Sequence, residues 1–142
     1  MADTQRIQQA IRSRIETLVV APNPSILWFY RWQQREYAGL TVSHVITDIV
    51  PSESKQVAMG SPRLFRTRGI LAFRIATPLD SGSGPNEAIG DLIEPHFLAL
   101  VDTSTDPPIR YRKPYWSPWE VPDESMYIGR LVVPWQADTN EP

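Results

Sequence analysis

The sequence contains no cysteine among its 142 residues and only two histidines, His44 and His96. The missing thiols exclude disulfide scaffolds, thiolate zinc sites, iron–sulfur clusters and cysteine nucleophiles. The two histidines form no closely spaced pair, and we interpret both as packed or surface side chains. We therefore expect neither a metal site nor a cofactor.

Long apolar runs are also missing. No stretch approaches the roughly 18 apolar residues that a membrane-spanning helix needs, and residues 1–6 lack the apolar core of a signal peptide. These features predict a protein that has no membrane contact and is made in a reducing cytoplasm. Neither sign of charge dominates, since 14 basic and 16 acidic residues give a net charge of -2. This balance argues against a general electrostatic grip on nucleic acid.

Proline, in contrast, is abundant. The 14 prolines are spread along the chain in separate turns. This distribution indicates turns between the elements of a folded domain and not a polyproline tract. The length suits a single domain over residues 1–142. We expect its last residues, from about residue 137, to form a loose tail.

The spacing of apolar residues predicts two helices at separate points of the chain. Ile7, Ile11 and Ile15 form one apolar stripe of a helix over residues 4–20. Pro85 starts a second helix, in which we expect Pro95 to introduce a kink or to leave two short helical pieces.

Runs of β-branched and aromatic residues predict the strands. They are expected at residues 26–32, 40–50, 64–77, 109–113 and 127–133, with a long, partly exposed hairpin excursion over residues 51–62. Gly69 lies inside the most regular of these strands and suggests a bulge or bend. Runs of strands with two separate helices predict an α+β fold, a mostly antiparallel sheet with the two helices packed on it.

Candidate catalytic groups are sparse. The turn at residues 81–84 lacks the frame of a nucleophile elbow and the lysine of a phosphate-binding loop. Glu87, Asp91 and Glu94 share one face of the second helix, where they could bind a cation, although a solvated acidic face is the favoured interpretation. We therefore expect a protein that is not an enzyme.

The placement of charge along the chain is more informative than its sum. A basic strand that carries Arg66, Arg68 and Arg74 on one face precedes an acidic helix that carries Glu87, Asp91 and Glu94. Three interpretations are open. The two sets pair within one subunit, they meet between neighbouring subunits of a ring, or the arginines contact passing nucleic acid.

The tryptophans have two interpretations. Trp116 and Trp119 lie in a proline-framed loop, and Trp28 and Trp32 lie in the aromatic strand. They are interpreted first as core and interface anchors, with Trp116 and Trp119 contacting a partner. The alternative is a stacking platform for bases or sugars, with positive charge supplied by nearby side chains. Those side chains are Arg110, Arg112 and Lys113.

Several of these segments, taken together, resemble a known family. They are the amphipathic helix at the start, the aromatic strand, the sequence FRTRGILAFRIATP at residues 65–78, a glycine-containing loop, the sequence AIGDLI at residues 88–93 and a closing strand at residues 127–135. This pattern covers about residues 5–137 and resembles the small tail terminator, or tail completion, proteins of long-tailed phages.

The resemblance implies a structural role in the virion, after assembly in the host cytoplasm. Such proteins form a ring, usually a hexamer, that caps the head-proximal end of the tail tube and stops its polymerisation. The resemblance implies the tail tube protein and a neck or head-completion protein as partners, and no active site. It also implies DNA that passes through the lumen without sequence-specific binding.

Two other functions stay open at this point. A neck or head-closure ring protein shares the size, the ring symmetry and the absence of catalysis. A single-stranded nucleic-acid binding module would use the tryptophans and the neighbouring basic residues, and salt-dependent binding to a short oligonucleotide would distinguish it.

Overall fold

The computed structural model describes residues 3–19, 26–33, 35, 42–58, 63–78, 84–98, 100–105, 107–117 and 126–141. The helices are α1 (Asp3–Val19), the short 3₁₀ helix η1 (Arg31–Gln33) and α3 (Gly84–Phe97). The strands are β1 (Leu27–Tyr30), β2 (His44–Ala58), β3 (Arg63–Pro78), β4 (Val101–Asp102), β5 (Ile109–Tyr111), β6 (Tyr115–Trp116) and β7 (Met126–Glu141).

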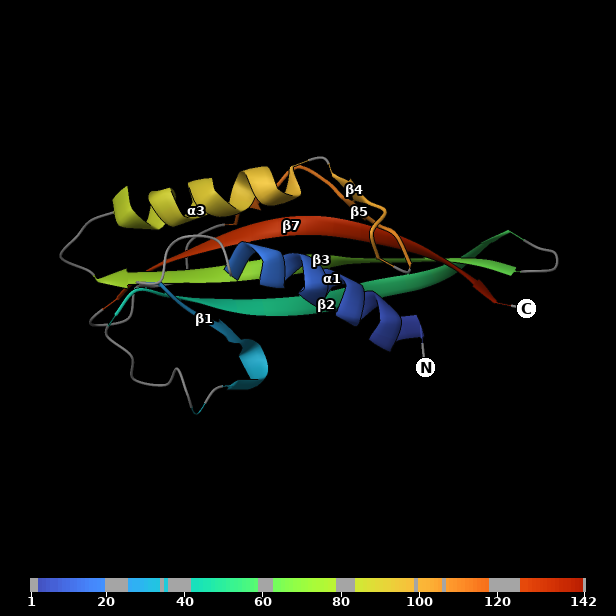
Figure 1. Cartoon of the computed structure of the whole chain (residues 1–142), viewed down its shortest axis with the longest axis horizontal. Coiled ribbons are helices and arrows are strands. Elements are labelled where there is room, and N and C mark those ends of the chain that lie inside the picture. Colours follow the sequence, from blue (N-terminus) through green and yellow to red (C-terminus); the bar gives the residue numbers. More distant parts are fainter. Residues whose placement is uncertain are drawn as a thin grey trace.

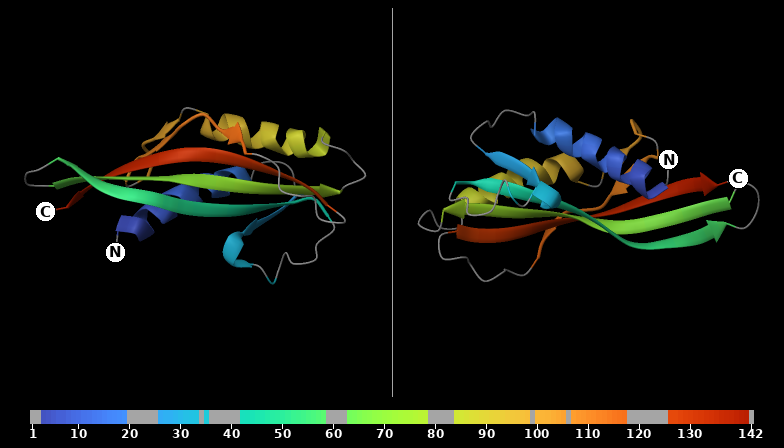
Figure 2. Two further views of the ribbon diagram at one scale, coloured as in Figure 1. Left: turned by 180° about the vertical axis from the view of Figure 1, so that it is seen from behind. Right: turned by 90° about the horizontal axis from the view of Figure 1, so that it is seen from below.

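The strands form one sheet in the order β1-β2-β3-β7-β5-β4, and β6 pairs with β7 beside this path. β1 runs parallel to β2, and the other pairs are antiparallel. Figure 1 shows the long strands crossing the molecule, and the right panel of Figure 2 shows α1 and α3 on the same face of the sheet. The fold is therefore α+β, with a mostly antiparallel sheet and two helices packed on it.

Alternation along the central strands explains which face the helices cover. Leu71, Phe73 and Ile75 of β3 are fully buried and point to the helix side, because successive side chains of a strand face opposite sides. The matching positions of β7 are Leu131, Val133, Trp135 and Ala137. α1 packs its expected stripe of isoleucines onto this surface, and α3 adds Ile89, Ile93 and Phe97. The main core is thus the layer between the helices and one face of the sheet.

The loose tail expected from residue 137 is wrong. Residues 137–141 continue β7, and Ala137 pairs with Thr67 on one side and with Ile109 on the other. Ala137 is 1% exposed and Thr139 is 3% exposed. The reason is the length of β3, whose backbone offers β7 a partner as far as Glu141.

Three other local expectations concern the hairpin over residues 51–62, Gly69 and Pro95. The expected hairpin is confirmed for the described residues, because residues 51–58 belong to β2, which pairs with β3, and residues 51–56 are exposed. Register shifts lie in β2 between Pro51, which pairs with Gly69, and Glu53, and again between Gln56 and Ala58, so the bulge is next to Gly69's partner and not at Gly69. α3 runs unbroken through Pro95, which lies in its last turn, so the helix is not divided into two short pieces.

Two smaller findings complete the fold. The aromatic strand expected at residues 26–32 is shorter than predicted, because β1 ends at Tyr30 and η1 begins at Arg31. No helix in the described part of the chain is long and apolar enough to cross a membrane.

Candidate interaction surfaces

α3 is fixed at its first turn by Asn86, which is fully buried. The Asn86 side-chain amide donates hydrogen bonds to the backbone oxygens of Ile75 in β3 (2.8 Å) and Tyr127 in β7 (3.3 Å). These bonds join the helix to the two central strands, because each backbone oxygen belongs to a different strand. The start of α3 therefore has one defined position on the sheet.

The last turn of α3 is fixed by α1. The Arg14 guanidinium donates to the backbone oxygen of His96 at 2.7 Å, and His96 Nε2 lies 2.7 Å from Thr17 Oγ1 and 3.0 Å from the backbone oxygen of Arg14. Burial lowers the pKa of His96 below 6.5, and the Arg14 charge lowers it further, against the opposing effects of the hydrogen bond to Arg14 and the Asp102 charge. His96 therefore favours its neutral form in this contact.

This lowered pKa predicts a pH dependence of stability. The unfolded chain binds a proton at residue 96 more readily than the folded chain, so the folded state should lose stability as the pH falls below about 6.5. The loss should be small, because His96 is only partly buried. Urea unfolding at a series of pH values, for the wild type and His96→Gln, measures it as the difference between the two curves. Parallel curves from pH 7.5 to pH 5.5 (about one unit either side of the usual value) would contradict the prediction.

With both ends fixed, α3 turns its acidic residues outward. Glu87 and Asp91 are exposed and Glu94 is partly exposed. None of the three forms an ion pair with a side chain in the described part of the chain. The described residues also contain no group of three or more potential metal ligands. We call Glu87, Asp91 and Glu94 the acidic face of α3.

Trp116 borders the acidic face of α3. Its indole lies against Gly90, where an added Cβ would come within 2.4 Å of the ring. Trp116 keeps 39% of its surface exposed, and its neighbour Tyr115 keeps 51%. Gly90 therefore makes room for an aromatic side chain that packs on the helix and keeps part of its surface exposed. Trp119 lies outside the described residues, so its role as a contact stays a prediction.

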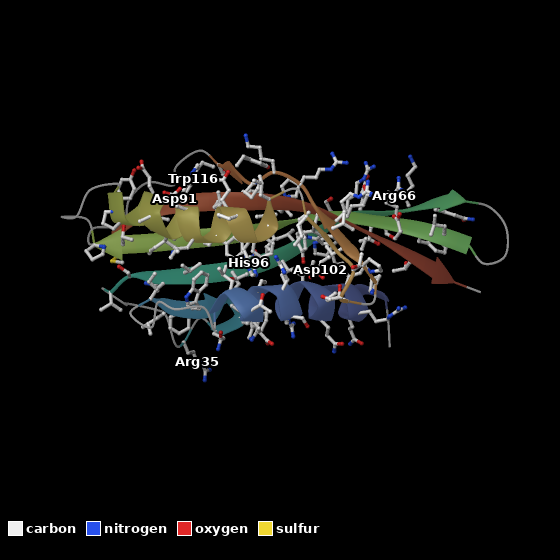
Figure 3. All side chains as sticks on the ribbon, turned by 45° about the horizontal axis from the view of Figure 1, so that its top comes forward. Arg35, Arg66, Asp91, His96, Asp102 and Trp116 are labelled. Atoms are coloured by element: carbon white, nitrogen blue, oxygen red, sulfur yellow. The ribbon has the colours of Figure 1, made fainter. Side chains whose placement is uncertain are left out.

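The structure does not bring the three arginines of β3 to the acidic face of α3. Arg66 donates two hydrogen bonds to the Asp138 carboxylate, at 2.9 and 3.1 Å, and these bonds raise its pKa. Arg68 contacts Gln136 at 3.3 Å and Glu53 at 3.9 Å. Arg74 lies opposite Arg130 in the register of β3 and β7. Figure 3 shows Arg66 and Asp91 at different ends of the molecule.

The expectation that these arginines pair with the acidic helix of the same subunit is therefore wrong for Arg66 and Arg68. All three arginines stand on the sheet face that points away from the helices, because they alternate with the core residues of β3. Asp138 escaped the sequence reasoning because it falls in the segment expected to be a loose tail.

A second surface surrounds Trp32, which the sequence reasoning named as a possible anchor without predicting its contacts with Arg12 and Tyr30. Trp32 is 62% exposed and stacks on Tyr30, with ring centroids 4.5 Å apart and planes 4° apart. The Arg12 guanidinium of α1 lies 4.6 Å from the Trp32 ring and 5.9 Å from the Tyr30 ring. We call Arg12, Tyr30 and Trp32 the Trp32 cluster. The sequence gives no sign that the chain turns into η1 at Arg31, because the run of aromatic residues is typical of one continuous strand.

Two more arginines flank the Trp32 cluster. Arg31 pairs with Asp48 of β2 at 3.0 Å while its own side chain stays 72% exposed. Arg35 is exposed and projects from the lower edge of the molecule in Figure 3. The cluster thus combines an exposed indole with cations that reach solvent.

Comparison with known proteins shows the fold and no more. No family model matches the chain, and no curated protein matches it. One solved structure, of a protein without a descriptive name, aligns over 96% of this chain and 96% of its own, with a TM-score of 0.70 and 14% sequence identity. At this identity the likeness establishes a shared architecture over nearly the whole of both chains, and it carries no information on function.

Proposed function

We propose that this protein is a structural virion protein that forms a ring at the head-proximal end of a long-tailed phage tail. In this role it is a tail terminator, which caps the tail tube, stops its polymerisation and joins the tail to the neck. The proposal extends the sequence resemblance to the folded molecule.

The arrangement of the resembling segments is the observation that carries this proposal. Residues 65–78 form β3 at the centre of the sheet, and residues 127–135 lie in β7, its antiparallel neighbour. Residues 88–93 lie in α3, whose Ile89 and Ile93 pack on those two strands. The segments that match the terminator pattern are therefore neighbours in one core, as parts of a shared fold would be.

The charges of the sheet are compatible with a lumen through which DNA moves. Each lysine or arginine that neutralises a phosphate adds to the affinity, so a strongly basic lining would retain the genome. Arg66 is already paired with Asp138, and Arg68 lies near Glu53. Pairing of these two arginines lowers the positive charge that this face would offer to passing DNA.

Native mass spectrometry of the purified protein over a range of concentrations tests the proposal. We expect a closed ring, most simply a hexamer, and negative-stain electron microscopy should show a central opening. A chain that stays monomeric at every concentration would contradict the proposed function. A ring that binds isolated tail tubes at one end and blocks the addition of tube subunits would distinguish a terminator from a neck protein.

A further inference from the structure

We propose that the ring closes when the Trp32 cluster of one subunit docks on the acidic face of α3 of the next subunit, between Leu92 and Trp116. This inference rests on the proposed function, because it names the contact by which such a ring would assemble. It assigns the occupant of both surfaces as a second copy of this chain.

The Trp32 cluster has the composition of an interface hot spot. Tryptophan, tyrosine and arginine are the residues that most often dominate binding energy. Stacking on Tyr30 and contact with Arg12 hold the indole in one orientation, so little conformational freedom is lost when a partner binds. Trp32 also has the largest exposed fraction among the large apolar side chains of the described residues.

The acidic face of α3 offers a matching acceptor. At 3.6 residues per helical turn, the carboxylates of Glu87 and Asp91 lie between Gly90, which Trp116 covers, and the exposed Leu92. Leu92 is 48% exposed although it belongs to a helix whose other large apolar residues are buried. A cation that approaches this face meets carboxylates bordered by apolar surface, which excludes water from the contact.

The charges of the two surfaces are complementary. The acidic face carries three carboxylates. Among the described residues, three arginines and two carboxylates lie in or beside the Trp32 cluster, namely Arg12, Arg31 and Arg35, and Glu16 and Asp48. Arg12 forms no ion pair with a described residue. Among these described residues the positive surplus is one charge, and it lies on guanidinium groups, of which that of Arg12 contacts the Trp32 ring.

The position of the surfaces fits a head-to-tail contact. In Figure 1, α3 runs along the top of the molecule and η1 lies at the bottom, and Figure 3 shows Asp91 and Arg35 on the same opposite sides. β1 is also the strand at one end of the sheet order, whereas α3 packs on β3 and β7. Two dissimilar surfaces on opposite sides form a heterologous contact, which repeats from subunit to subunit and gives a ring when the rotation between neighbours closes.

Pairing through the sheet edge is the less suitable contact. β1 covers only residues 44–47 of β2, which leaves residues 48–58 without a strand neighbour on that side in the described part of the chain. This edge carries Pro51, the bulge at Ser52, and the charged residues Glu53 and Lys55. Such features prevent a further strand from adding to an edge. The side-chain surfaces, and not the edge, therefore carry the proposed contact.

Two variants and their mixture test this contact by native mass spectrometry. Trp32→Ala removes the indole from one surface, and the double variant Glu87→Lys/Asp91→Lys reverses the other. Each variant alone should associate at least about 30-fold more weakly than the wild type, the effect of losing a hot-spot residue. In the mixture, each variant supplies the surface that the other lacks. We therefore expect a heterodimer with one intact contact, and no ring.

Arg110→Glu is the matched control, because Arg110 is exposed on the sheet face away from the helices and should assemble as the wild type does. Circular dichroism confirms that each variant is folded. A ring that persists in Trp32→Ala or in the charge-reversed variant would overturn this contact and leave the proposed function standing. A mixture without heterodimer would overturn it as well, and a monomeric wild type would overturn both.

One further outcome separates a protein partner from nucleic acid. If a short single-stranded oligonucleotide quenches the tryptophan fluorescence of the wild type at physiological salt, and Trp32→Ala abolishes its binding, the cluster is a base-stacking site. That result would overturn the proposed subunit contact. We expect no binding under these conditions.

Discussion

Phe97→Ala should lower the free energy of unfolding by about 4 kcal/mol, the range observed when a buried phenylalanine is truncated. Phe97 has no exposed surface and ends α3 at the centre of an aromatic group. Its ring centroid lies 5.6 Å from that of Phe73 in β3 and 5.1 Å from that of Tyr111 in β5. The truncation therefore leaves a cavity where a helix and two strands meet.

Urea denaturation followed by circular dichroism measures this loss. Leu98→Ala is the control, because Leu98 is the next residue and is 47% exposed. The control should change the free energy of unfolding by less than about 0.5 kcal/mol. A loss for Phe97→Ala that is no larger than the loss for Leu98→Ala would contradict the packing described above.

Gly69→Ala should cost about 3 kcal/mol, at the upper end for overpacking a core. A Cβ at residue 69 would lie 2.3 Å from the backbone oxygen of Val50 and 2.5 Å from the Trp135 ring. Val50 belongs to β2 and Trp135 to β7, so both neighbours of β3 would have to move. Neither can move easily, because one contact is backbone and Trp135 is 3% exposed.

Gly84→Ala is the control for this substitution. Nothing lies within 4 Å of a Cβ at residue 84, which begins α3, and alanine there should be neutral or stabilise the protein by up to about 1 kcal/mol. Thermal unfolding of the two variants side by side checks the prediction. Equal melting temperatures for Gly69→Ala and the wild type would show that the strands next to residue 69 have room that the structure does not indicate.

The sequence pattern predicted the helices and the central strand, because each carries its own periodicity. Ile7, Ile11 and Ile15 can bury one stripe only in a helix. Phe73 and Ile75 alternate with the smaller or charged residues Ala72 and Arg74, which favours a strand. The two-helix, mostly antiparallel architecture followed from the order of these elements and is confirmed by the structure.

The parts that could not be predicted depend on contacts between distant segments. Residues 137–141 have no strong apolar pattern, and they form a strand because β3 supplies the hydrogen-bonding partner. The Trp32 cluster needs Arg12, which is 20 positions earlier in the chain and reaches Trp32 only after α1 packs on the sheet. Likewise, Arg66 could not be assigned to Asp138 before the register of β3 and β7 was known.

The pairing of β3 with β7 also determines when the chain can fold. Its paired residues lie between 48 and 78 positions apart in the sequence, and contacts of such long range form slowly because the intervening chain must first be ordered. During synthesis, β2 and β3 can form their hairpin early, but β3 lacks its second neighbour until residues 126–141 have emerged. Translation that stops before residue 126 would therefore yield a product without a closed core, which cellular proteases would degrade before it could enter an assembly.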